Sequence, residues 1–218
     1  MALMASDKPQ RLVGVRSRGL SGKIALEVGV AAFESTLEQD LIELLDFDPR
    51  VSEILVQPFS LHHEEDGARR RYTPDVRATY VAPGAEVVVY EVKYQEELRR
   101  NWAKYRARFG AAYRFCRQNG WRFKVMTEKH IRTPYLANVK FLRRFLRLAE
   151  QELITGQLLY TLKALGPTTP QALLAATYMS SESRLRAIPM LWKMVGDGRV
   201  GCELNEPLTM NSTVWMVP

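Results

Sequence analysis

Residues 72–93 read YTPDVRATYVAPGAEVVVYEVK, and this stretch decides the fold. Two runs rich in β-branched and aromatic residues flank a Pro-Gly pair that favours a turn. The stretch therefore predicts two strands joined as a hairpin. Because residues two apart in a strand project from the same face, Glu91 and Lys93 are expected to point the same way.

Charged residues stand at the ends of these two expected strands. Asp75 precedes the first strand, and Glu91 and Lys93 end the second. Two carboxylates and a lysine are costly to gather in one place unless something compensates their charge. Carboxylate oxygens suit Mg²⁺, and a lysine can orient a water molecule or stabilise charge that develops on a phosphate. The same pattern also occurs in exposed ion pairs of little energetic weight, so both interpretations stay open here.

A third acid lies upstream. Residues 35–38, Ser-Thr-Leu-Glu, have the form of a capping box and predict the start of a helix. Glu38 could serve only as part of the cap, by reaching back to the Ser35 amide. However, Ile42 and Leu45 follow it at helical spacing, so Glu38 points along the apolar edge of the helix. Glu38 is therefore also a candidate metal ligand or catalytic base.

The rest of the first 148 residues alternates between strand and helix patterns, which predicts an α/β fold with a mixed sheet flanked by helices. His62 and His63 stand beside three acids and could suggest a metal site, but the cluster is better interpreted as a polar hairpin loop. The expected elements are a strand over 51–62, a helix over 95–118 with Trp102 on its buried face, a strand over 121–126 and a helix over 133–147.

Basic residues are concentrated just after the hairpin. The chain has a net charge of +7, and residues 95–150 contain 15 Lys or Arg against 4 Asp or Glu. Too few acids are present to balance the arginines of the helix over 95–118, which favours contact with nucleic-acid phosphates over a merely solvated face. Residues 1–23 form a basic arm that is expected to be flexible, either disordered or ordered by DNA or a partner. The predicted DNA-binding residues are Arg99, Arg100, Lys104, Arg108, Arg16 and Arg18.

Residues 149–218 predict a separate small domain. Three helices followed by a β-hairpin describe a winged helix. Residues 151–218 contain 5 basic and 5 acidic residues, and this neutrality favours docking to a protein over binding to DNA.

The overall composition is that of a soluble globular protein, with 46% hydrophobic and 25% charged residues. The sequence contains no apolar run long enough for a membrane span and no signal-peptide pattern at its start, so no membrane association is expected. Cys116 and Cys202 are isolated, which indicates reduced thiols and a cytoplasmic protein.

An ordered set of motifs resembles the TnsA endonuclease subunit of heteromeric cut-and-paste transposons. That family belongs to the restriction-endonuclease-like nucleases, whose signature is PD…(D/E)-x-K. By matching position, Glu38, Asp75 and Lys93 correspond to the family's catalytic acid, metal-binding aspartate and lysine. Glu91 occupies the D/E position, where some members have Gln. The motifs are Ser35-x-x-Glu38, Phe47-Asp-Pro49, Gln57-Pro58, Tyr72-Thr-Pro-Asp75, Glu91-Val-Lys93 and the segment 131–138.

The resemblance implies a DNA endonuclease that uses Mg²⁺, with Mn²⁺ as a possible substitute, held by Asp75, Glu91 and Glu38. It implies hydrolysis at the 5′ ends of the transposon, on the strand that is not transferred. A DDE-type transposase, TnsB, would cut and join the other strand, and the C-terminal domain would contact the AAA+ regulator TnsC. The expected domains are the basic arm 1–23, a PD-(D/E)xK endonuclease domain 24–148 and a winged-helix-like docking domain 149–218.

Two other functions are compatible with the sequence. A free-standing restriction-like or repair nuclease would cut DNA alone and choose its own sites, but the neutral C-terminal domain counts against it. A non-catalytic DNA-binding regulator would have a degenerate nuclease fold, and the intact set of Asp75, Glu91 and Lys93 argues against that.

Overall fold

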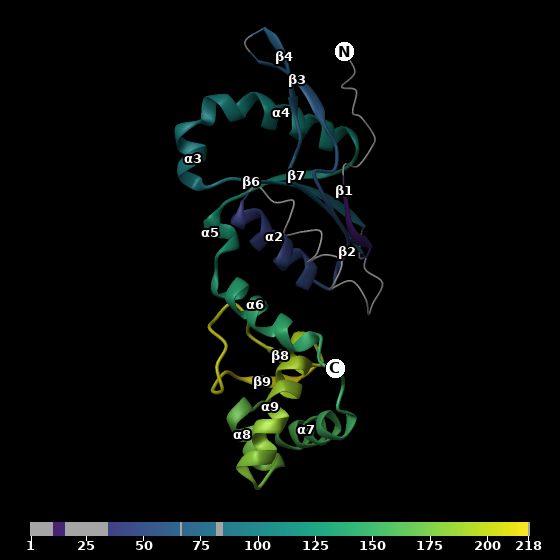
Figure 1. The fold of residues 1–218 in the computed structure, drawn as a ribbon, viewed down its shortest axis with the longest axis vertical. Helices are drawn as coiled ribbons and strands as arrows, with labels where there is room; N and C mark the ends of the chain where they lie inside the picture. Colours follow the sequence, from purple (N-terminus) through teal and green to yellow (C-terminus); the bar gives the residue numbers. More distant parts are fainter. Residues whose placement is uncertain (1–10, 16–34, 66, 82–84, 218) are drawn as a thin grey trace. The chain divides into compact units, whose positions relative to one another are not determined.

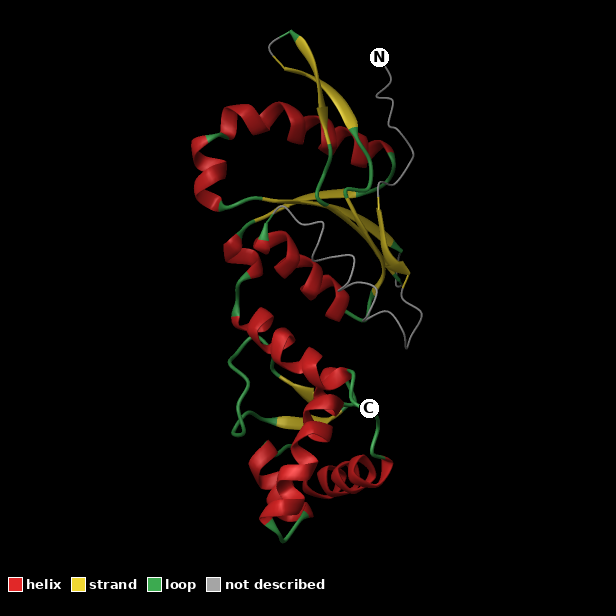
Figure 2. Ribbon diagram, viewed as in Figure 1, coloured by secondary structure: helices red, strands yellow, loops and turns green. Residues whose placement is uncertain are grey.

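The computed structural model of the protein describes residues 11–15, 35–65, 67–81 and 85–217. The chain divides into two compact units, one ending at Arg132 and the other beginning at Thr133. Figures 1 and 2 show the elements of each unit. The first unit contains β1 (Arg11–Val15), α2 (Thr36–Phe47), β2 (Val51–Val56), β3 (Leu61–Glu65), β4 (Ala68–Tyr72), β5 (Val76–Tyr80), β6 (Glu86–Val92), α3 (Gln95–Arg100), α4 (Trp102–Gln118), β7 (Arg122–Met126) and α5 (Glu128–Ile131).

Five strands of the first unit form its main sheet, in the order β1-β2-β5-β6-β7. Neighbouring strands are antiparallel except for β6 and β7, which are parallel. A parallel pair needs a crossover connection, and α3 with α4 provides it. In Figure 1, α4 runs along one face of the sheet and α2 along the other. The expectation of a mixed sheet flanked by helices is therefore confirmed.

Strands β5 and β6 form the predicted hairpin. Val76 pairs with Tyr90, and the antiparallel register continued by one position sets Asp75 beside Glu91. The two acids therefore come together because the strands that carry them are neighbours. The turn expected between the strands falls at residues 82–84, outside the described residues.

The strand expected over residues 51–62 is instead two strands in different sheets. Strand β2 belongs to the main sheet, whereas β3 pairs with β4 in a separate two-stranded sheet. The chain leaves the main sheet at Gln57, which has a φ of 48°, in the left-handed region that few residues other than glycine adopt. Its N–H donates to the Asp75 carbonyl at 2.8 Å. Pro58 follows and has no N–H with which to continue a ladder.

The prediction that His62 and His63 lie in a hairpin loop is wrong. Both residues belong to β3, where they pair with Arg71 and Arg70 of β4. His63 is buried, and β3 lies against α4. The chain turns only after Glu65, so the histidines are part of the ladder.

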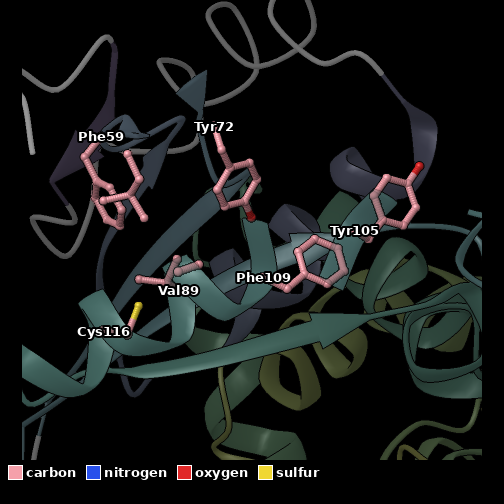
Figure 3. Packing of buried hydrophobic residues seen from close by; sticks show 8 residues of the cluster. Phe59, Tyr72, Val89, Tyr105, Phe109 and Cys116 are labelled. Atoms are coloured by element: carbon pink, nitrogen blue, oxygen red, sulfur yellow. The ribbon is translucent and has the colours of Figure 1, made fainter. Parts of the chain in front are cut away.

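The single helix expected over 95–118 is two helices. Helix α3 ends at Arg100 and α4 begins at Trp102, and Asn101 between them has a φ of −115° and a ψ of 20°, which are not helical. Trp102 is 54% exposed, so its expected place on the buried face is also wrong. Residues farther along α4 pack on β3, β4 and β6 as expected (Figure 3). This cluster contains Phe59, Leu61, Tyr72, Val89, Tyr105, Phe109, Ala112 and Cys116.

The second unit contains the three helices and the β-hairpin predicted from the sequence, together with one further helix. Helix α6 was expected in the endonuclease domain, but in the structure it belongs to this unit and lies against α9. Asn138 of α6 donates from Nδ2 to the carbonyls of Leu204 and Glu206, and its Oδ1 accepts from the Leu208 N–H. The elements are α6 (Pro134–Leu146), α7 (Glu152–Leu165), α8 (Pro170–Thr177), α9 (Ser181–Gly196), β8 (Val200–Cys202) and β9 (Val214–Met216).

Five residues of the expected N-terminal arm form a strand. Residues 11–15, expected in the flexible arm, form β1 and pair with β2 at the edge of the main sheet. Leu12, Val13 and Val15 give this segment a strand-like composition. Arg16 and Arg18, two of the predicted DNA-binding residues, lie outside the described residues. Within the described part of the chain, no helix is long and apolar enough to cross a membrane.

Candidate active site

Asp75, Glu91 and Lys93 meet at one end of β5 and β6. The Lys93 Nζ atom lies 3.6 Å from Asp75 Oδ2 and 3.2 Å from Glu91 Oε1. Glu91 is 2% exposed, and the side chains of Asp75 and Lys93 are largely buried. The structure therefore brings together three of the four residues predicted to form the catalytic site, at a distance where their charges interact strongly.

The backbone of Val92 holds this cluster in place. Its N–H donates to Asp75 Oδ2 at 2.7 Å, and its carbonyl accepts from Lys93 Nζ at 2.8 Å. The Lys93 ammonium thus lies where three oxygens converge, namely one from Asp75, one from Glu91 and the Val92 carbonyl. A charged hydrogen bond to a backbone amide fixes a carboxylate more firmly than solvent does.

Tyr72 is a member of the site to which the sequence analysis gave no role. Its hydroxyl donates to Glu91 Oε2 at 2.5 Å. The tyrosine ends β4, so it reaches Glu91 from the second sheet, across the cluster under α4. The sequence shows that Tyr72 stands three residues before Asp75. It does not show that β4 pairs with β3 and so turns Tyr72 toward Glu91.

The environment of Glu91 favours its neutral form. Burial and, next, the negative charge of Asp75 raise the pKa of Glu91 from 4.5 to about 7. Lys93, the Tyr72 hydrogen bond and Arg108 act in the opposite direction but do not outweigh burial. A buried carboxyl group with such a shifted pKa, in contact with a lysine and a second carboxylate, is typical of a functional site.

Lys93 remains a cation in spite of its burial. Burial alone would lower the pKa of Lys93, but the carboxylates of Asp75 and Glu91 raise it, and the net shift is upward. The charge of Glu38 adds to this upward shift.

Glu38 belongs to the N-cap of α2, although its side chain bonds to the Ser35 hydroxyl and not to the Ser35 amide that the capping box predicts. It is buried in the first turn of α2, where Ser35 Oγ accepts from its N–H and donates to its Oε1. Its electrostatic effect on Lys93 nevertheless ties it to the cluster of Asp75, Glu91 and Lys93. Both interpretations of Glu38, cap and site residue, are therefore compatible with the structure.

The oxygen atoms around Lys93 suit a divalent cation. Within the described residues, no group of three or more His, Cys, Asp or Glu side chains is placed to hold a metal. Asp75 and Glu91 nevertheless both contact the Lys93 ammonium, and the Val92 carbonyl supplies a third oxygen to the same ammonium. Hard carboxylate and carbonyl oxygens are what Mg²⁺ and Mn²⁺ prefer, so the chemistry of the donors fits such a metal.

The basic residues predicted to bind DNA differ in their surroundings. Arg99, Arg100 and Lys104 are exposed on α3 and α4, and Arg100 pairs with Glu96 one helical turn away. Arg108 is half-buried, and its guanidinium lies over the aromatic rings of the cluster beneath α4. Exposed cations are available to phosphates, whereas Arg108 is close enough to Glu91 to influence its charge.

Comparison with known families agrees with this geometry. Residues 48–128 match the family model described as TnsA-like endonuclease N terminal. This stretch of the chain is a TnsA-like endonuclease domain. The match spans β2 to β7 and includes Asp75, Glu91 and Lys93. No curated protein matches the chain. The TnsA-like domain implies a nuclease related to Tn7 transposition.

Proposed function

We propose that this protein is the endonuclease subunit of a heteromeric cut-and-paste transposase. It hydrolyses one phosphodiester bond at each 5′ end of the transposon, on the strand that is not transferred. The observation that carries this proposal is the convergence of Asp75, Glu91 and the Val92 carbonyl on the Lys93 ammonium, inside a TnsA-like domain. A separate DDE-type transposase, TnsB, acts on the other strand.

Asp75, Glu91 and the Val92 carbonyl are the groups that would hold Mg²⁺, with Mn²⁺ as a substitute. When bound, such an ion polarises the scissile phosphate and lowers the pKa of a coordinated water. Lys93 positions the attacking water by hydrogen bonding, or stabilises the negative charge that develops on the phosphate oxygens. Glu38 orients the nucleophile or contributes a further carboxylate. Burial of the cluster strengthens each of these electrostatic effects.

The exposed cations of α3 and α4 would hold the DNA backbone beside this site. Arg99, Arg100 and Lys104 follow closely after Lys93 in the chain. Contacts from such side chains to phosphates position a duplex without reading its sequence. Recognition of the transposon ends would therefore depend on the transposase partner.

The second unit is proposed to be a winged-helix-like module that docks the AAA+ regulator TnsC. Its residues 151–218 contain 5 basic and 5 acidic residues, and some of its large side chains with apolar surface are exposed. Tyr160 of α7 is 79% exposed, and Met179, between α8 and α9, is 94% exposed. Exposed aromatic and methionine side chains are typical of protein-binding surfaces.

Strand-resolved cleavage tests the proposed function. End-labelled transposon-end DNA is incubated with Mg²⁺, the cognate transposase and either the wild type, Lys93→Ala or Lys124→Ala. Lys124 is an exposed lysine of β7 and serves as the matched control. We expect the 5′-end cut with the wild type and Lys124→Ala and its loss with Lys93→Ala. The 5′-end cut from all three proteins would show that Lys93 is structural, and no 5′-end cut from any of them would favour a non-enzymatic DNA-binding role.

A further inference from the structure

The two oxygens of Glu91 have different partners. Oε1 lies 3.2 Å from Lys93 Nζ, on the side shared with Asp75. Oε2 accepts the hydrogen bond from the Tyr72 hydroxyl at 2.5 Å. A carboxylate that is held at one oxygen cannot rotate freely about its last side-chain bond, so the Tyr72 hydrogen bond fixes the direction of Oε1.

Tyr72 is itself held in place. The residue is 6% exposed, and its ring lies against the Phe109 ring with a centroid distance of 6.4 Å (Figure 3). The Arg108 guanidinium lies over the Tyr72 ring at 5.6 Å. Because packing already fixes the ring, forming the hydrogen bond to Glu91 costs little additional side-chain conformational entropy.

The chain on either side of Tyr72 is also anchored. Ser60 Oγ accepts from Arg71 Nε at 2.9 Å and shares a 2.8 Å hydrogen bond with Thr73 Oγ1. The segment that ends in Asp75 thus supplies one acid of the site and, three residues earlier, the donor that orients the other acid.

We propose that Tyr72 is a positioning residue that aims Glu91 Oε1 at the point shared with Asp75. This inference rests on the proposed function, since it assigns to Glu91 the role of a metal ligand. Groups that hydrogen-bond to ligating carboxylates typically change metal affinity about 10- to 100-fold when they are removed. Tyr72 therefore contributes to metal affinity without contacting the metal.

Metal binding by the full chain tests this role. Isothermal titration calorimetry with Mn²⁺ alone compares the wild type, Tyr72→Phe, Tyr105→Phe and Glu91→Ala, which removes both side-chain oxygens. Tyr105→Phe is the matched control, because this tyrosine belongs to the same buried cluster but its hydroxyl donates to Glu97. We expect Mn²⁺ affinity to fall about 10-fold in Tyr72→Phe, to stay unchanged in Tyr105→Phe and to be lost in Glu91→Ala.

A second measurement separates positioning from damage to the fold. The Mn²⁺ concentration that gives half-maximal DNA cleavage should rise about 10-fold in Tyr72→Phe. A variant that merely misfolds would lose amplitude, because fewer molecules are active, but would keep the same half-maximal concentration.

The outcomes distinguish this inference from the proposed function. If Glu91→Ala loses Mn²⁺ binding while Tyr72→Phe binds as tightly as the wild type, the positioning role of Tyr72 is refuted and the metal site stands. If the wild type and Glu91→Ala bind Mn²⁺ equally, the metal site itself is refuted, and the role of Tyr72 with it.

Discussion

The backbone N–H of Val92 donates a 2.7 Å hydrogen bond to Oδ2 of Asp75. This bond joins the residue before β5 to the last residue of β6 through a side chain, beyond the terminal backbone pair of Val76 and Tyr90. Asp75 is therefore a structural acceptor as well as a candidate metal ligand. A substitution that tests the catalytic role of Asp75 must therefore preserve its hydrogen bond to Val92.

Asp75→Asn is expected to abolish DNA cleavage while keeping the fold. The asparagine Oδ1 can still accept from the Val92 N–H, so the free energy of unfolding should stay within about 1 kcal/mol of the wild-type value. Asp75→Ala should cost about 1–3 kcal/mol, because it leaves a buried N–H without its acceptor. Urea denaturation and the strand-resolved cleavage assay measure the two effects. Cleavage by Asp75→Asn at the wild-type rate would remove Asp75 from the site.

The pKa of Glu91 predicts how stability depends on pH. Because burial raises the pKa of Glu91 from 4.5 to about 7, the folded metal-free protein retains a proton that the unfolded chain releases. The free energy of unfolding should therefore fall as the pH rises from about 4.5 to about 7. Asp75, Lys93, Tyr72 and Arg108 face Glu91 and are the charged or polar groups that influence this titration.

Glu91→Gln provides the control for this pH dependence. Glutamine carries no titratable proton, so this contribution to the slope should disappear in the variant. Urea denaturation in the presence of EDTA at several pH values measures it. A slope that is identical in the wild type and in Glu91→Gln would show that Glu91 has an ordinary pKa.

Lys93→Met should destabilise the metal-free protein. At a pH above 7, where Glu91 is ionised, the carboxylates of Asp75 and Glu91 repel each other in a buried setting once the ammonium is removed. The melting temperature in EDTA should therefore fall, and Mn²⁺ should raise it more in Lys93→Met than in the wild type, because the ion relieves the same repulsion. Lys124→Met, at an exposed position of β7, should behave like the wild type. An unchanged melting temperature in Lys93→Met would contradict the proposed electrostatic role.

Lys104 is expected to contact a DNA phosphate. Removing one phosphate contact reduces the slope of log affinity against log salt concentration by about 0.9 for duplex DNA. Lys104→Ala should show this reduction in a fluorescence-anisotropy titration at several salt concentrations. Lys163→Ala, an exposed lysine of α7, is the control and should leave the slope unchanged. Equal slopes for the wild type and Lys104→Ala would exclude Lys104 from the DNA interface.

Asn138 should be important for the stability of the second unit. Its buried side chain makes three hydrogen bonds to the backbone between Leu204 and Leu208. Asn138→Ala leaves those backbone groups unpaired. Each unpaired buried group costs about 1–3 kcal/mol and a group that water can reach costs less, so the free energy of unfolding should fall by about 2–4 kcal/mol. Asn205→Ala, in the same loop but exposed, should cost much less. Differential scanning calorimetry would show the difference, and similar melting temperatures for the two variants would refute it.

Most of the candidate site could be predicted because its residues are close in sequence. Asp75, Glu91 and Lys93 belong to one hairpin, and the spacing of two between Glu91 and Lys93 fixes their common face. The roles of these residues stay predictions, but the register of β5 and β6 alone suffices to bring them together. The capping motif at Ser35 likewise predicted where α2 begins, since a cap is made within four residues.

Errors arose where backbone conformation depended on distant partners. Gln57 adopts a positive φ while its N–H is bound to the Asp75 carbonyl. Pro58 is the local sign that a strand ends here, but it does not show that the chain enters a second sheet. Asn101 interrupts the amphipathic pattern of 95–118 without any glycine or proline to mark the break. The helix beginning at Thr133 was recognised, but its place in the second unit depends on its packing against α9.

The sequence by itself determined the hairpin, the charges at its end and the uneven distribution of basic residues, because each depends on neighbours along the chain. Three features appear only once the chain is folded: Tyr72 holds Glu91, Arg108 lies over aromatic rings, and Val92 contacts both Asp75 and Lys93. These contacts join different strands and helices. Their geometry follows from how the two sheets and α4 pack, which side-chain spacing along one strand cannot specify.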